Sequence, residues 1–248
     1  MACTLNLYTD YLLSSTDQTS ATGLSRLFDG HISHDQMTRW LTSVYLDSQQ
    51  VWTHAKPLIR QTERELGTDD LAVLIVDDSI VEKAHTDANA LLCVHYDYSL
   101  GRYVKGLNFV SLIDAAGPVS VPIAVGLVEK TQAIIDPKTQ KVSYKSPLTK
   151  NQLLQAMLRV ALPGWPQPQP AYRYLLADSW YTSAENRNTV RGLGHECIFA
   201  LPSSRTVALT QEARRKGAFL ALNTGALPEG QPLCVWLRSL EEAVLVVR

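Results

Sequence analysis

Two aspartates that each follow a strand-like stretch are the residues of this sequence best suited to do chemistry. The run 71–76 is rich in Leu, Val and Ile and leads into Asp77 and Asp78, and the stretch 172–177 leads in the same way into Asp178. A short apolar run bounded by polar residues is typical of a buried β-strand. Carboxylates at the ends of neighbouring strands lie at one edge of a sheet, where a metal ion or a ligand can reach them.

Paired carboxylates of this kind are suited to metal-dependent phosphoryl transfer. Two divalent ions ~3.5–4 Å apart can activate the attacking oxygen and stabilise the leaving oxygen. Mg²⁺ prefers oxygen ligands and keeps several waters, so a few carboxylates suffice to bind it. We therefore predict that Asp78 and Asp178 are catalytic and bind Mg²⁺ or Mn²⁺. Adjacent strand residues point to opposite faces, so only one of Asp77 and Asp78 is expected to face the metal. Capping or turn formation at a strand end is the other role open to each aspartate.

The elements that would position these aspartates follow one another in the order β, β, β, α, β, α, β. They are expected at 71–76, 104–114, 119–128, 151–161, 172–177, 183–191 and 198–201. In the ribonuclease H-like fold, three antiparallel strands lead into parallel ones, and the first and fourth strands are neighbours. The sequence therefore predicts an α/β fold with a ribonuclease H-like mixed sheet over 69–202, in which Asp78 and Asp178 come together.

The segments on either side of this predicted sheet have different patterns. Residues 1–68 show apolar residues at helical spacing, and Ser33 and Gln36 have the spacing of a capping box, so we expect a helical N-terminal region. A DNA-binding unit and a helical cap on the sheet are equally open for it. Residues 203–248 show short β patterns and turns, and the last of these patterns is apolar and unfinished. We interpret 203–248 as the start of an incomplete β-rich insertion.

Composition restricts the class of protein. The 248 residues are 46% hydrophobic and carry a formal net charge of −1, which allows a large core and gives no global argument for a nucleic-acid partner. The four cysteines form no C-x-x-C pair, which predicts reduced thiols in an intracellular protein. No signal peptide and no membrane-span pattern is found, so we predict a soluble, cytoplasmic chain without a membrane partner.

A local basic surface is still predicted. The segment 131–147 is polar and basic, and either a solvated face or a phosphate-contacting loop would explain it. The residues that we expect to contact DNA phosphates are Lys83, Lys105, Lys145 and Lys150. Trp180 and Tyr181 could pack or stack on a base, and packing is the commoner role. His85 and His95 lack metal-ligand spacing to another His or Cys.

Several short motifs, taken together and in order, resemble DDE transposases, and in particular the group of bacterial insertion sequence four. The motifs are Asp78-Ser79-x-x-Glu82-Lys83, His95-Tyr96-Asp97, Val104-Lys105-Gly106-x-Asn108, Lys145-Ser146-Pro147-x-Thr149-Lys150-Asn151 and Ala177-Asp178-Ser179-Trp180-Tyr181. The resemblance implies DNA transposition: cleavage of transposon ends and strand transfer into target DNA, with Mg²⁺ held by two Asp and one Glu. It matches Asp78 and Asp178 to the two Asp positions. It also implies double-stranded DNA as the partner and a homodimer on paired ends.

The third acid of the resemblance is not matched. In the family it lies beyond the β-rich insertion, on a helix with a Tyr/Arg/Glu/Lys signature. Glu241 and Glu242 lack that signature, so the sequence is interpreted as a truncated transposase. A non-catalytic chain that competes for DNA, or a relic, is therefore the alternative function. A phosphatase with an aspartate nucleophile is a weaker alternative, because Ser79 and Ile80 occupy the positions where its second Asp would be expected.

Overall fold

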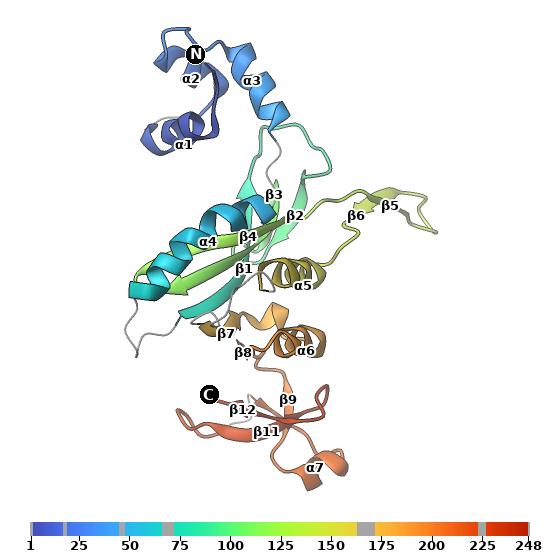
Figure 1. Cartoon of the computed structure of the whole chain (residues 1–248). Helices are drawn as coiled ribbons and strands as arrows, with labels where there is room; N and C mark the ends of the chain where they lie inside the picture. Colours follow the sequence, from blue (N-terminus) through green and yellow to red (C-terminus); the bar gives the residue numbers. More distant parts are fainter. Residues whose placement is uncertain are drawn as a thin grey trace. The chain divides into compact units, whose positions relative to one another are not determined.

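The structure, a computed structural model, describes residues 2–16, 19–44, 48–65, 72–162, 172–222 and 227–247 (Figure 1). The chain divides into two compact units, 1–47 and 48–248. The first unit contains α1 (Leu5–Ser14), α2 (Ala21–Leu27) and α3 (His34–Ser43) around a small core. The capping box predicted at Ser33 is confirmed, because the Ser33 hydroxyl accepts from the Gln36 N–H and the Gln36 side chain accepts from the Ser33 N–H.

The second unit is built on a mixed sheet. Its strands are β1 (Ala72–Glu82), β2 (Leu92–Asp97), β3 (Arg102–Ala116), β4 (Val119–Leu127), β7 (Tyr172–Ala177) and β8 (Glu196–Phe199). They lie in the order β2-β3-β1-β7-β8. β4 pairs with β3 on the side opposite to β1, next to β2 along the strand. β3 is antiparallel to both β1 and β4, whereas β1, β7 and β8 are parallel to one another. This topology confirms the predicted ribonuclease H-like sheet, because β1 and β7, the strands predicted at 71–76 and 172–177, lie side by side. β2 was not among the expected strands, and it pairs with residues 102–107 of β3.

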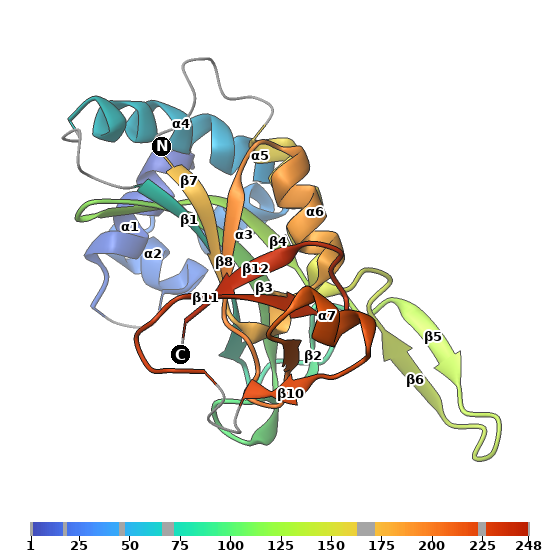
Figure 2. The same cartoon turned by 90° about the horizontal axis from the view of Figure 1, so that it is seen from below.

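Three helices cover one face of the sheet: α4 (Ser48–Glu65), α5 (Lys150–Ala161) and α6 (Ala184–Gly192) (Figures 1 and 2). Their apolar residues, among them Ile59, Leu158 and Val190, share one core with Leu74 and Leu112 of the sheet. Residues 48–65 were expected to belong with the N-terminal helices, but the buried side chains of Trp52, Ala55 and Ile59 pack in the core of the sheet unit and make α4 part of it. Thr149 and Ser183 are the N-caps of α5 and α6, the helices expected at 151–161 and 183–191.

The strand pattern before Asp77 extends further than the sequence suggested. β1 continues through both aspartates to Glu82, because β3 pairs with it along its whole length. The aspartates are therefore inside a strand rather than at its end. The parallel neighbour β7 pairs only as far as Ala177, opposite Val76, so Asp77 and Asp78 lie where β7 leaves the sheet. Gly106 permits the close approach of the two strands, since a Cβ there would be 2.4 Å from the Val81 carbonyl oxygen.

The basic segment 131–147 is a β-hairpin and not an irregular loop. β5 (Gln132–Ile135) and β6 (Val142–Lys145) pair only with each other and project from the sheet unit (Figures 1 and 2). Asp136 organises the connecting turn, because its carboxylate accepts from the N–H groups of Lys138 and Thr139. Side chains in this hairpin are almost all exposed.

A second, smaller sheet follows β8. It contains β10 (Leu220–Ala221), β9 (Thr206–Ala208), β11 (Leu233–Leu237) and β12 (Ala243–Val246) in that order, with α7 (Gln211–Arg215) beside it. Val207, Val235, Leu237 and Leu240 form its own core. The β character expected after residue 203 is thus present, and α7 was not foreseen.

In the described part of the chain, no helix is long and apolar enough to cross a membrane. The four cysteines are free thiols.

Candidate active site

Asp78 lies on the helix-covered face of the sheet, and two side chains hold its carboxylate. In the pairing of β1 with β3, Asp78 lies opposite Val110, which is buried. Every second residue of β1 before it, up to Val76, is also buried, and alternate strand residues share a face, so Asp78 lies on the same face as this core. Lys150, the first residue of α5, forms an ion pair with its Oδ2. The Tyr181 hydroxyl lies 3.2 Å from its Oδ1. Both oxygens of Asp78 are therefore engaged, by one cation and one hydroxyl.

Asp178 begins the turn that carries Tyr181 to this place. It caps the short 3₁₀ helix η1 (Ser179–Tyr181), and its Oδ1 accepts from the Trp180 N–H at 3.0 Å. The Tyr181 side chain is fully buried. Burial raises the pKa of the Tyr181 hydroxyl well above its usual value, and the negative charges of Asp78, Asp178 and Asp77 raise it further. The hydroxyl is thus a neutral donor, which is hydrogen-bonded to Asp78 and also feels the charge of Asp178.

Asp77 faces the other side of the sheet. It pairs with Ser111 across β3, and the Ser111 hydroxyl donates to the Asp77 backbone carbonyl at 3.2 Å. Its own carboxylate accepts from the Asp78 N–H at 2.8 Å. The expectation that the two adjacent aspartates point to opposite faces is confirmed, and Asp78 is the one that shares its face with α5.

A buried amide network positions the Asp178–Tyr181 turn. Asn186 of α6 is fully buried, and its Nδ2 donates to the Tyr181 carbonyl at 2.9 Å and to Asn151 Oδ1 at 2.8 Å. The Asn186 Oδ1 accepts from Gln155 Nε2 at 2.9 Å. Residues of α5 and α6 are thereby fixed to η1. The sequence analysis noted Asn151 only as part of a motif and gave it no role, since a positioning amide has no distinctive local pattern.

His95 lies beside the site and is neutral. Only 6% of it is exposed, its Nδ1 is 3.4 Å from Asn108 Nδ2, and its Nε2 is 3.2 Å from Cys93 Sγ. Burial lowers its pKa to about 4, with smaller contributions from the charges of Lys130 and Lys150. A neutral ring accepts from Asn108 at Nδ1 and carries its proton on Nε2. His85 is exposed and takes no part in this cluster.

The four lysines predicted to contact phosphate are placed differently. Lys150 binds Asp78 instead of facing solvent. Lys83 and Lys105 are backbone neighbours, since the Lys83 N–H donates to the Lys105 carbonyl at 2.8 Å. Lys145 ends β6 on the projecting hairpin and is exposed. The structure therefore brings one of the four to the aspartates and leaves Lys145 away from the sheet.

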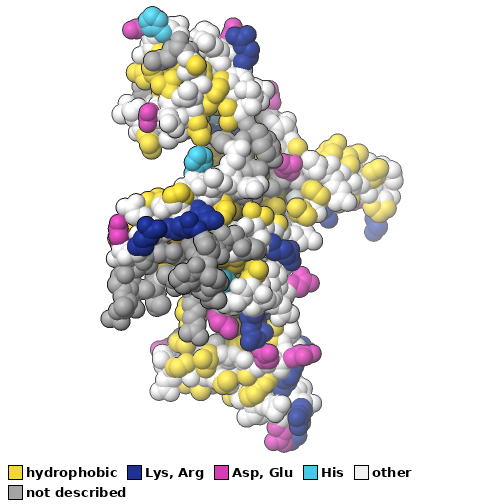
Figure 3. Space-filling model, in the orientation of Figure 1, with side chains coloured by type: hydrophobic (Ala, Val, Ile, Leu, Met, Phe, Trp, Pro, Cys, Tyr) yellow, Lys and Arg dark blue, Asp and Glu magenta, His cyan; other side chains and the backbone are white. Residues whose placement is uncertain are grey.

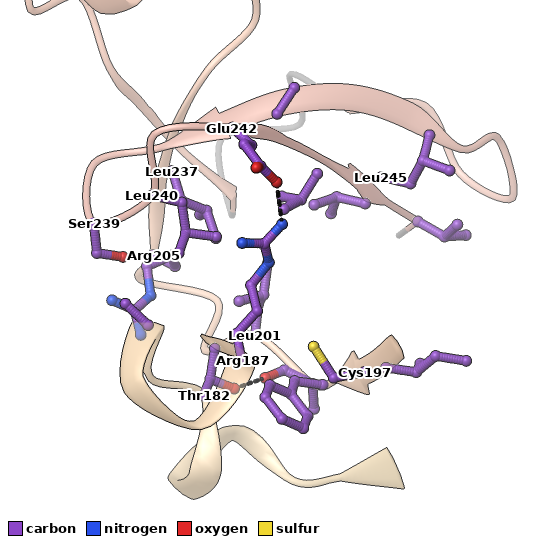
Figure 4. Close-up of a pocket in the computed structure, with 18 of the residues that line it drawn as sticks. Thr182, Arg187, Cys197, Leu201, Arg205, Leu237, Ser239, Leu240, Glu242 and Leu245 are labelled. Carbon is purple, nitrogen blue, oxygen red and sulfur yellow. Dashed lines mark hydrogen bonds and ion pairs between the residues drawn. The ribbon is translucent and has the colours of Figure 1, made fainter. Parts of the chain in front are cut away.

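A third acid does not join the two aspartates within the described ranges, where no group of three metal-ligating side chains is found. Glu242 instead pairs with Arg187 at 2.8 Å and with Arg191, both of α6, which lowers its pKa. Figure 4 shows this pairing in a cavity of 1090 Å³ lined by residues of α6, β8 and the second sheet. The cavity does not include Asp78 or Asp178.

The two aspartates offer the right donors for Mg²⁺, which often binds through one or two carboxylates together with water and substrate phosphates. Lys150 lies against the Asp78 oxygen that such an ion would use. The donor set therefore fits a divalent ion, on the condition that the ammonium group of Lys150 gives way.

Comparison with known proteins gives the family. The family model described as DDE superfamily endonuclease matches residues 1–218. The chain belongs to the DDE superfamily endonucleases. No curated protein sequence matches it. Among solved structures, this DDE superfamily endonuclease is similar to a piggyBac transposase in the cryo-EM structure of its synaptic complex with hairpin DNA. Sequence identity is 11% and the TM-score is 0.39, and the match covers 92% of this chain and 45% of that chain.

Proposed function

We propose that this DDE superfamily endonuclease is a transposase of the insertion sequence four type, which cleaves transposon ends and transfers them to target DNA. The observation that supports the proposal is the placement of Asp78 on β1 and of Asp178 directly after β7, the parallel neighbour of β1, with the Tyr181 hydroxyl hydrogen-bonded to Asp78. The family supports phosphodiester chemistry, and the two carboxylates support a divalent ion, Mg²⁺ or Mn²⁺.

In this proposal the chain's own residues hold and orient the reacting groups. A divalent ion bound by Asp78 and Asp178 would supply charge to activate the attacking oxygen and stabilise the leaving one. Tyr181, kept neutral, donates to Asp78 and fixes the direction of its carboxylate. The Asn186 amide holds the Tyr181 backbone and thereby the turn that begins at Asp178. Lys150, once displaced from Asp78, is free to pair with a DNA phosphate.

DNA binding is supported by three groups of cations in the sheet unit. Lys83 and Lys105 lie side by side near the end of β1. The hairpin of β5 and β6 carries exposed Lys138, Lys141 and Lys145, and a two-stranded ribbon fits the major groove. Figure 3 shows a row of Lys and Arg side chains over α4, where the basic residues follow one another at four-residue spacing: Lys56, Arg60 and Arg64. Such cations bind the DNA backbone without reading its sequence.

A non-catalytic chain that binds DNA and competes with an intact transposase is the second candidate. It is favoured by the ion pair of Lys150 with Asp78, because the ammonium group competes with a metal ion for the carboxylate. Both candidates bind DNA, and only the first requires a metal at Asp78. The homodimer expected from the family resemblance belongs to the proposal as well.

Metal binding separates the two candidates. Calorimetric titration of the chain with Mn²⁺ is expected to show binding that Asp78→Ala and Asp178→Ala both abolish. Asp136→Ala is the matched control, because this aspartate lies on the projecting hairpin. Binding that persists in both site variants, or that is absent from the unaltered chain, would contradict the proposed metal site. If DNA binding remained in that case, the competitor would be the better description.

A further inference from the structure

Four aromatic side chains form an exposed group at the turn between β2 and β3. Tyr96 and Tyr103 are cross-strand partners with ring centroids 5.1 Å apart. Tyr98, in the turn, lies 4.9 Å from Tyr96, and Trp180 of η1 lies 5.5 Å from Tyr98. We call these four residues the aromatic cluster. It joins two parts of the sheet unit that are far apart in the sequence.

The cluster is not part of the core. Tyr98 is 73% exposed, Tyr103 72% and Trp180 54%, whereas Tyr181, next to Trp180, is fully buried. Large aromatic side chains contribute most when they are buried, and contiguous exposed apolar surface often marks a binding site. The rings of Tyr96, Tyr98 and Tyr103 meet edge to face, which leaves ring faces open to a further partner.

The cluster reaches the candidate active site through Tyr98 and Trp180, whereas Tyr96 and Tyr103 lie on the Asp77 face of the sheet, opposite to Asp78. Trp180 follows Asp178 by two residues, and its backbone N–H donates to the Asp178 carboxylate. Any group that stacks on Trp180 is therefore held within one short turn of that carboxylate. This placement matters because a phosphodiester positioned at the aspartates has its neighbouring bases close by.

The charges around the cluster favour a nucleotide over a protein segment. Lys83 and Lys105 provide two adjacent cations, and Lys105 lies on the same face of β3 as Tyr103. The carboxylates of the site repel phosphates but not uncharged bases. A nucleotide whose base stacks on the rings and whose phosphate pairs with Lys83 or Lys105 would bind both the aromatic and the cationic part of this surface.

We infer that the aromatic cluster stacks unpaired bases of the DNA strand next to the phosphodiester that is cleaved. Stacking on aromatic rings is tolerant of sequence, because every base has a π face, and the cations hold the backbone. The inference rests on the proposed function, since it requires DNA at the aspartates. It assigns to Trp180 and Tyr98 a role in holding a distorted or opened DNA end.

Fluorescence anisotropy with two DNA probes tests this role. One probe is a blunt duplex, and the other is the same duplex with four unpaired bases on one strand, one of them 2-aminopurine. The unaltered chain is expected to bind the second probe more tightly and to quench its 2-aminopurine. Tyr98→Ala and Trp180→Ala should each weaken binding of the second probe about 5- to 150-fold, the range for one stacked base, and remove the quenching. Blunt-duplex binding should not change.

Two controls make the result specific. Trp180→Phe keeps an aromatic face and should retain most of the preference for unpaired bases. Tyr144→Ala removes an equally exposed ring from the projecting hairpin, outside the cluster, and should leave the preference intact. Circular dichroism of each variant reports whether it folds.

The outcomes distinguish this inference from the proposed function. Unaltered preference or quenching in the Tyr98→Ala and Trp180→Ala variants would overturn the stacking role while leaving DNA binding in place. Equal loss in Tyr144→Ala would overturn it as well. Failure of the unaltered chain to bind either probe would refute the proposed function, and the stacking role with it. If the Ala variants instead shift a monomer–dimer equilibrium in sedimentation and leave DNA binding unchanged, the cluster is a protein interface.

Discussion

The ion pair between Lys150 and Asp78 leads to a prediction in which one substitution has two opposite effects. Lys150→Met removes the ammonium group and keeps a side chain of similar length. We expect the variant to be less stable than the unaltered chain in the absence of metal, and to bind Mn²⁺ more tightly. Both effects have one cause, because the cation that stabilises Asp78 in the free protein is also the group that a metal ion must displace.

The size of the stability effect follows from burial. Each side chain of the pair is 22% exposed, between the fully exposed pairs that contribute up to about 1 kcal/mol and the buried pairs whose disruption costs about 3–5 kcal/mol. We take about 2 kcal/mol for this pair. Lys150 is also the first residue of α5, where a cation opposes the helix dipole, and its removal returns about 0.5 kcal/mol. The net loss in the free energy of unfolding is therefore about 1.5 kcal/mol.

The metal effect has the opposite sign. An ion that binds Asp78 only after Lys150 has moved has its apparent affinity reduced by the free energy of the pair. If that free energy is about 1–2 kcal/mol, Lys150→Met should lower the Kd for Mn²⁺ about 5- to 30-fold. Calorimetry measures the Kd, and urea unfolding without metal measures the stability. Lys138→Met, which removes an exposed lysine from the hairpin, should change neither quantity.

Unchanged or weaker Mn²⁺ binding by the Lys150→Met variant would refute this reasoning, because it would show that the ammonium group does not compete for the Asp78 oxygen. A loss of stability without a gain in affinity would leave Lys150 as a structural partner only.

Two further predictions concern the surroundings of the site. The pKa of His95 is about 4 in the folded chain and near 6.5 in the unfolded chain. As the pH falls, the unfolded state therefore binds the proton first. The free energy of unfolding should drop by up to about 3 kcal/mol between pH 6.5 and pH 4. Urea unfolding across this range should show a steeper loss for the unaltered chain than for His95→Gln, and equal slopes would contradict the assignment. Asn186→Ala removes three hydrogen bonds made by a fully buried amide and should lower stability by about 2–3 kcal/mol, whereas Asn188→Ala, exposed on the same helix, should have little effect. Equal effects in thermal unfolding would contradict the positioning role of Asn186.

Local features of the fold could be predicted from the sequence because their causes are local. The capping residues Ser33, Thr149 and Ser183 each satisfy an N–H three residues later, so the helix starts are encoded within one turn. Gly101 takes a positive φ of 63° in the turn between β2 and β3, a conformation that glycine adopts without steric cost. The order of the predicted strands and helices was sufficient to predict the mixed sheet and the adjacency of β1 and β7, although β2 was not foreseen.

Other features depended on pairing between distant segments. β1 extends beyond the aspartates only because β3 offers it a partner that far, and polar residues alone gave no sign of it. The hairpin at 132–145 consists of exposed residues, so its apolar pattern was too weak to indicate strands. Trp180 and Tyr181 are adjacent and both aromatic, yet one is exposed and the other buried, which the 3₁₀ turn after Asp178 decides.

The sequence by itself determined which carboxylates follow strand patterns, and from their order it predicted that Asp78 and Asp178 belong to one site. Tertiary structure alone decided what surrounds them. Lys150 meets Asp78 across 72 positions of the chain, and Asn186 meets Asn151 across 35, and no local pattern encodes either contact. The physical reason is that caps and turns are satisfied within a few residues of backbone. The charge balance and hydrogen bonding of a buried site are satisfied only by the elements that the fold brings against it.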